Sequence, residues 1–175
     1  MLSNSKNIAF ALTWFLILPL ATSSWAQSQL QEDEEPIKFS AEYQIEEGST
    51  RGVILLSVNI QEDHYIYSLS EIENGPPPSK IGVEQSAAFK LTDKFLPDSK
   101  PIVIEHDPVY ECRIEKHKGK VVFWVPFELS DRSSSEQMTF EVNFEGAVCS
   151  KTGSCRLLRD RKFEAKFSGY YRPRN

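Results

Sequence analysis

Alternation of apolar and polar residues with a period of two constrains the fold of this chain more than any other feature. From Ile37 to Ile45 every second residue is apolar, which is the pattern of a β-strand with one buried face. The alternation returns at 121–129, 138–144 and 163–167, while residues 53–60 are apolar on both faces. No segment repeats its apolar positions with the period of an amphipathic helix. About eight short strands separated by turn residues predict an all-β fold, an immunoglobulin-like antiparallel β-sandwich.

The amino terminus has the layout of a secretory signal peptide. A polar start carrying Lys6 precedes the apolar run 8–20, and the small residues Ser24 and Ala26 stand where a signal peptidase cleaves. The apolar run is shorter than the roughly 20 residues of a membrane span, so an uncleaved anchor is the less favoured alternative. We therefore expect residues 1–26 to be removed, leaving a periplasmic or secreted protein without a membrane span.

The remainder has the length of a single domain. We expect residues 27–35 to form a flexible acidic lead-in, residues 36–169 to form the sandwich, and residues 170–175 to form a basic tail. The whole sequence holds 25 acidic and 20 basic residues, a net charge of −5. This balance disfavours nucleic acid and anionic lipid as partners.

Two of the three cysteines, Cys149 and Cys155, are six positions apart in a stretch that we expect to be a loop between two strands. A structural disulfide is the commonest use of such a pair in an exported protein, although closing so small a ring contributes only about 2.4 kcal/mol. A zinc site would also need Cys112 with His106 or His117, but this cysteine spacing is unusual for zinc.

Redox exchange is the third use that the cysteines allow. Five basic residues lie within a few residues of the pair: Lys151, Arg156, Arg159, Arg161 and Lys162. Their positive field would stabilise a thiolate, unless they are ordinary solvated charges. The residues alone leave the three uses open, and no nucleophile-elbow motif favours a hydrolase.

Four segments, in order along the chain, resemble the amino-terminal periplasmic domain of the thiol:disulfide interchange protein DsbD. They are DHYIYS at 63–68, GPPPSKI at 75–81, DPVYECRIEKHKGKVVFWVPF at 107–127 and CSKTGSC at 149–155. The similarity covers roughly residues 37–168, and the family's domain is an immunoglobulin-like sandwich.

The resemblance implies a relay of reducing equivalents from a thioredoxin-like donor to oxidised periplasmic proteins, such as a disulfide isomerase or a cytochrome maturation protein. Such a protein is a component of a protein-disulfide reductase system and needs no metal or organic cofactor. Because the sequence ends at Asn175 without the family's membrane and thioredoxin domains, we expect the donor to be a separate chain.

The resemblance also implies roles for individual residues. Cys149 and Cys155 match the family's redox pair, which works through mixed disulfides. Tyr65 and Tyr67 match a Tyr-x-Tyr run that shields the pair. A cap loop maps, with a gap, onto His106, Asp107, Val109 and Tyr110, of which Tyr110 is the expected shield.

The sequence departs from the family around both cysteines. Gly146 and Ala147 replace a common Tyr-Gln before the first cysteine, and 156–158 replaces prolines after the second. Cys112 is an additional thiol in the cap segment, which we expect to be buried because it shares strand parity with its neighbours. These changes keep an alternative open: a non-catalytic secreted immunoglobulin-like binding or scaffold module with a structural loop disulfide.

Overall fold

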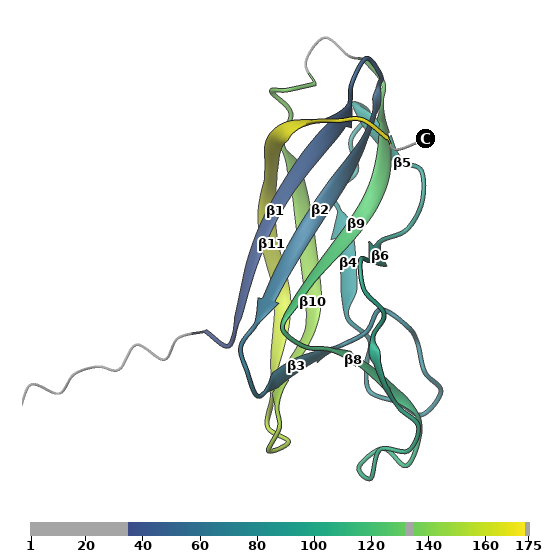
Figure 1. Cartoon of the computed structure of the whole chain (residues 1–175), viewed down its shortest axis with the longest axis vertical. Coiled ribbons are helices and arrows are strands. Elements are labelled where there is room, and N and C mark those ends of the chain that lie inside the picture. Colours follow the sequence, from purple (N-terminus) through teal and green to yellow (C-terminus); the bar gives the residue numbers. More distant parts are fainter. Residues whose placement is uncertain (1–34, 132–134, 174–175) are drawn as a thin grey trace, which may run out of the picture. The chain divides into compact units, whose positions relative to one another are not determined.

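The computed structural model describes residues 35–131 and 135–173, and every regular element in these ranges is a β-strand (Figure 1). The predicted signal peptide and nearly all of the predicted acidic lead-in lie outside the described residues. A search of the described residues finds no helix with the length and apolar character needed to cross a membrane.

Eleven strands follow one another along the chain. They are β1 (Ile37–Glu46), β2 (Arg51–Ile60), β3 (His64–Tyr67), β4 (Lys80–Val83), β5 (Phe89–Leu91), β6 (Leu96–Pro97), β7 (Ile102–Ile104), β8 (Ile114–His117), β9 (Lys120–Leu129), β10 (Phe140–Ser150) and β11 (Cys155–Tyr171).

The strands form two sheets that share β11. In the first sheet β2 lies between β1 and β9, antiparallel to both, and β5 and β6 pair with the far side of β9. In the second sheet β10 pairs with β3, β4 and β11, and β8 joins β3 to β7. The first part of β11 pairs antiparallel with β10, and its last part, from Lys166, pairs parallel with β1. The antiparallel sandwich is therefore confirmed, with β1 and β11 as a parallel pair.

Aromatic side chains from the two sheets meet in the core. The ring centroids of Tyr43 and Phe140 are 4.8 Å apart, and those of Phe39 and Phe144 are 4.9 Å apart. The buried Tyr43 hydroxyl donates hydrogen bonds to the carbonyls of Ser135 and Met138, so its polar atom is not left unpaired. The alternating residues of 121–129 all face this core, as predicted.

Strand boundaries near the cysteines differ from the prediction. β10 runs on to Ser150 and β11 already begins at Cys155, so both cysteines lie on strands and not on a long loop. The weak apolar alternation of residues 109–116 predicts a strand, but the structure has strand only from Ile114, and the residues before it form turns. Figure 1 shows the β10–β11 hairpin and the connection from β7 to β8 at the same end of the sandwich.

Candidate functional site

The candidate site is built around a disulfide that joins adjacent strands. Cys149 and Cys155 are directly opposite each other in the β10–β11 register and are bonded, with their Cα atoms 4.0 Å apart. Just beyond them the Ser150 amide donates to the Ser154 carbonyl at 2.8 Å. Gly153 supplies the positive φ of 91° that the tight connection requires. The hairpin ladder therefore brings the two sulfur atoms together.

The disulfide lies on the face of its sheet that points away from the main core. Val148 and Ile66 are opposite each other on β10 and β3 and belong to the main core. The next opposed pair, Cys149 and Tyr65, must point to the other face because side chains alternate along a strand. A second apolar cluster forms on that outer face.

The outer cluster consists of residues that share this face or fold over it. Its buried members are Tyr67, Ile114 and Cys149, and Tyr65, Ile104, Tyr110, Cys112 and Ala147 pack against them. The structure thus brings the two predicted shielding tyrosines of β3 and one predicted cap residue together around Cys149.

The two bonded cysteines differ sharply in exposure. Cys149 is 0% exposed, whereas Cys155 is exposed. A partner molecule can therefore approach the sulfur of Cys155 but not that of Cys149. The two bonded residues therefore differ in how accessible they are to solvent and to an external molecule.

Three tyrosines and a lysine line the buried side of the pair. The centroid of the Tyr67 ring lies 5.5 Å from that of Tyr65 and 6.3 Å from that of Tyr110, both with edge-to-face geometry. Lys116 Nζ lies 4.4 Å from the centroid of the Tyr65 ring. Burial raises the pKa of the Tyr67 hydroxyl and lowers that of the Lys116 ammonium, because both charged forms lose solvation.

The cap loop, residues 105–113 between β7 and β8, is folded around one carboxylate. Asp107 Oδ1 accepts hydrogen bonds from the Val109 amide at 2.9 Å and the Tyr110 amide at 3.2 Å. The Asp107 amide donates to the Cys112 carbonyl at 2.8 Å and so closes the loop. Tyr110 faces the cluster, while His106 and the 80% exposed Val109 lie outside it. Asp107 therefore shapes the cap, and Tyr110 is the predicted cap residue that contacts the site.

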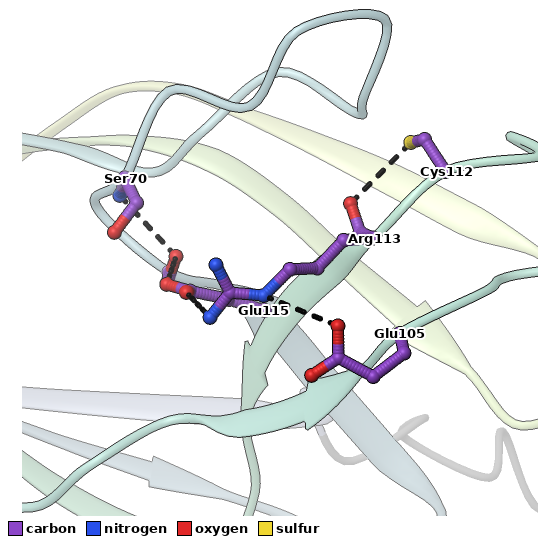
Figure 2. Close-up of polar contacts among 6 residues, drawn as sticks. Ser70, Glu105, Cys112, Arg113 and Glu115 are labelled. Atoms are coloured by element: carbon purple, nitrogen blue, oxygen red, sulfur yellow. Dashed lines mark hydrogen bonds and ion pairs between the residues drawn. The ribbon is translucent and has the colours of Figure 1, made fainter.

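Arg113 fixes the carboxy-terminal end of the cap loop (Figure 2). Its guanidinium lies 2.7 Å from Glu115 Oε1 and 3.9 Å from Glu105 Oε2, and Glu115 Oε2 accepts a hydrogen bond from Ser68 Oγ at 3.2 Å. Ser68 follows directly on Tyr67 at the end of β3. These contacts connect both ends of the cap loop to the strand that carries the shielding tyrosines.

Cys112 differs from the prediction. It lies in the turn before β8, is half-buried, and is a free thiol that donates to the Arg113 carbonyl at 3.3 Å. Figure 2 shows this contact directed at the backbone. Strand parity predicted full burial, but no strand extends over this position, so parity does not apply.

The basic residues around the hairpin are mostly neutralised by ion pairs. Lys151 pairs with Asp63, Arg156 and Arg161 pair with Glu35 at 3.8 Å and 2.8 Å, and Lys162 pairs with Glu141 at 2.5 Å. Arg159 is exposed and has no such partner among the described residues. The positive field predicted for a thiolate is consequently weaker than the count of basic residues implied.

A pocket of about 370 Å³ opens beside Cys155. Its walls come from the hairpin, from β3, from the cap loop and from the proline-rich connection, and include Tyr67, Pro77, Pro78, Tyr110, Ala147 and Leu157. Three consecutive prolines at 76–78 by themselves indicate only a rigid surface connection. Their place in GPPPSKI, one of the four segments that carry the family resemblance, is the sequence signal that could have linked them to the site.

The residues considered for zinc do not converge. Two of the cysteines are bonded to each other, and His117 is 3% exposed and packs edge-on against Phe123 in the main core. Within 35–131 and 135–173, no three His, Cys, Asp or Glu side chains form a group that could hold a metal ion.

Comparisons with known proteins identify the fold. No family model matches the chain, and no curated protein matches its sequence. The structure is similar to the N-terminal periplasmic domain of ScsB from Proteus mirabilis, with a TM-score of 0.52 and 18% identity over 77% of this chain. The match covers 48% of the ScsB chain, so this protein spans about half its length. It confirms the predicted fold.

A second solved structure is the N-terminal domain of DsbD from Neisseria meningitidis in its reduced form. The TM-score is 0.46 and the identity 14%, over 78% of this chain and 90% of that one. Nothing below rests on this second likeness.

Proposed function

We propose that the chain is a periplasmic or secreted thiol–disulfide exchange protein. It would take reducing equivalents from a thioredoxin-like donor and pass them to oxidised exported proteins, such as a disulfide isomerase or a cytochrome maturation protein. The observation that carries the proposal is the asymmetry of the disulfide, with exposed Cys155 and fully buried Cys149 on opposed strand positions.

Cys155 is the proposed entry point for electrons. A donor thiolate attacks Cys155 Sγ, the bond to Cys149 breaks, and Cys149 leaves as a thiolate that takes up a proton. The donor's second thiolate then attacks the sulfur of the donor's first cysteine in the mixed disulfide and releases reduced Cys155. The pair gains two electrons and two protons, and the donor dithiol becomes a disulfide.

Delivery reverses these steps on an acceptor. The Cys155 thiolate attacks the acceptor disulfide and expels one acceptor thiolate. Cys149 then attacks Cys155 Sγ, re-forms the internal disulfide and releases the second acceptor thiolate. The β10–β11 register holds Cys149 directly opposite Cys155, so the second nucleophile is already in place and this step occurs within the domain.

Trapping experiments test this division of roles. Cys149→Ser, mixed with an oxidised thioredoxin-like protein, should form a mixed disulfide through Cys155, because Cys149 is no longer present to expel the partner. Cys155→Ser should give none, since Cys149 is shielded. We also expect a reduction potential within the range of exchange proteins, roughly −120 to −270 mV, and not below about −300 mV as for structural disulfides.

A scaffold module with a structural disulfide is the second candidate. It is favoured by the ion pairs near the hairpin, in which three carboxylates offset most of the positive charge of Lys151, Arg156, Arg161 and Lys162. Such a module would form no covalent complex through either cysteine and would hold its disulfide below about −300 mV.

A further inference from the structure

We infer that the pocket beside Cys155 binds a large apolar side chain next to the partner's reactive cysteine, and that Arg159 selects partners with a carboxylate beside that side chain. This inference rests on the proposed exchange function and names the kind of partner segment that the site accepts. It concerns a surface on which this chain departs from the DsbD pattern, at Ala147 and at 156–158.

The walls of the pocket are suited to an apolar side chain. Tyr67, Tyr110, Pro77, Pro78 and Leu157 provide rings and aliphatic carbons, and Ala147 leaves the space between them unfilled. The volume of about 370 Å³ is at the lower end of the ~300–1,000 Å³ typical of ligand pockets. It therefore suits one or two side chains and not an extended ligand.

Leu157 makes this surface accessible to a partner. Its side chain is 60% exposed and lies two residues after Cys155 on β11, so both point to the same face. The exposed leucine adds apolar surface to the pocket wall that a partner's side chain can cover. Because Cys155 lines the same pocket, a side chain seated there holds the partner's cysteine close to the exposed sulfur.

The charges around the pocket leave one cation unbalanced. Lys80 and Glu145 both line the pocket and are directly opposite each other on β4 and β10, so their charges offset. Arg159 lines it too, is exposed, and lacks an ion pair within the part of the chain that the structure describes. A partner carboxylate beside the apolar side chain would complement Arg159, and a partner lysine would be repelled.

Reduced protein and small disulfide probes test the inference. The probes are peptides with one leucine, one cysteine capped by thionitrobenzoate, and either two aspartates or two lysines. The Cys155 thiolate attacks the peptide sulfur and expels coloured thionitrobenzoate, and Cys149 then releases the peptide thiol while the internal disulfide forms. Two electrons pass from the protein to the capped peptide, and the absorbance gives the rate.

We expect the aspartate peptide to react roughly two- to fivefold faster than the lysine peptide, as for one exposed ion pair, with less difference at high salt. Arg159→Glu should reverse this order. Arg156→Glu changes the net charge equally, but Arg156 already pairs with Glu35 and does not line the pocket, so the order should persist. Leu157→Ser should slow the reaction of the peptides that contain leucine. Their rate should approach that of a control peptide in which glycine replaces the leucine.

Uncharged hydroxyethyl disulfide distinguishes a failure of docking from a failure of exchange. If every variant exchanges with it but both peptides react equally, or if Arg156→Glu acts like Arg159→Glu, the docking inference is overturned and exchange stands. If the protein exchanges with no disulfide, the proposed function fails. The protein could also dimerise at higher concentration and lose its preference between the peptides. That result would show that a second copy of the chain occupies the pocket, and it would also overturn the inference.

Discussion

Tyr65 lies directly opposite Cys149 on the neighbouring strand, and both side chains belong to the cluster on the outer face of the second sheet. A strand face that points away from the main core is normally solvated. Here the cap loop covers it, and that cover leaves Cys149 fully buried while its bonded neighbour remains exposed.

Tyr110→Ala should open access to Cys149 in the reduced protein. Tyr110 packs on Tyr67, and removing its half-buried ring forfeits part of the roughly 1.5–3 kcal/mol that a fully buried side chain contributes. Alkylation of Cys149, followed by mass spectrometry, should become about tenfold faster or more because the cap opens more readily. Val109→Ala is the matched control on the same loop, since Val109 is outside the cluster. Equal acceleration in both variants would contradict a specific shield.

Asp107→Ala should loosen the cap loop, because two amides lose their acceptor. Each hydrogen bond contributes about 0.5–1.5 kcal/mol to the stability of the folded loop. Losing both should therefore accelerate hydrogen exchange at the amides of Val109 and Tyr110 by about tenfold. Asp107→Asn keeps the Oδ1 acceptor and is the control, so its exchange rates should stay close to those of the unchanged protein. If Asn accelerates exchange as much as Ala, the charge and not the hydrogen bonds holds the loop.

The sequence predicted the sandwich well because a period of two reports directly which side chains enter the core. The same rule explains the errors near the site. On β10 the segment from Gly146 to Cys149 is covered on both faces, so the polar alternation disappears and the strand resembles the start of a loop. β11 begins with mostly exposed, charged residues, so its first residues lack the apolar alternation from which a strand is predicted.

The site was only partly predictable for a different reason. The resemblance located Cys149, Cys155 and the β3 tyrosines, because these residues lie in short matching motifs. The ion pair between Lys151 and Asp63 joins residues far apart in sequence, as do the other pairs near the hairpin. The number of basic residues therefore overestimated the positive field, which depends on tertiary neighbours.

Cys112→Ser should leave the reduction potential of the Cys149–Cys155 pair unchanged. The Cys112 thiol contacts the Arg113 backbone and is half-buried, so we expect slow labelling by a thiol reagent in the folded protein and fast labelling after unfolding. Mass spectrometry of the oxidised protein should find Cys149 bonded to Cys155. A bond from Cys112 to either one would contradict this assignment.

His117 should make the protein less stable in mild acid. Its Nε2 is buried and has no hydrogen-bond partner among the described residues, and burial lowers the pKa of the imidazole, a shift that Asp98 and Glu115 only partly oppose. Because the folded pKa is below the unfolded value of about 6.5, the unfolded state binds more protons as the pH falls through this range. The stability contributed by neutral His117 is thus present above about pH 6.5 and is lost on acidification.

The apolar variant His117→Leu should reduce that loss. Urea unfolding at about pH 7.5 and about pH 5.5 measures this loss of stability. Between the two pH values, the free energy of unfolding should fall less in the variant than in the unchanged protein. His106→Gln removes an exposed histidine of the cap loop and should keep the full pH dependence. The assignment fails if His117→Leu retains the same slope, because some other group would then bind the proton, or if His106→Gln flattens it.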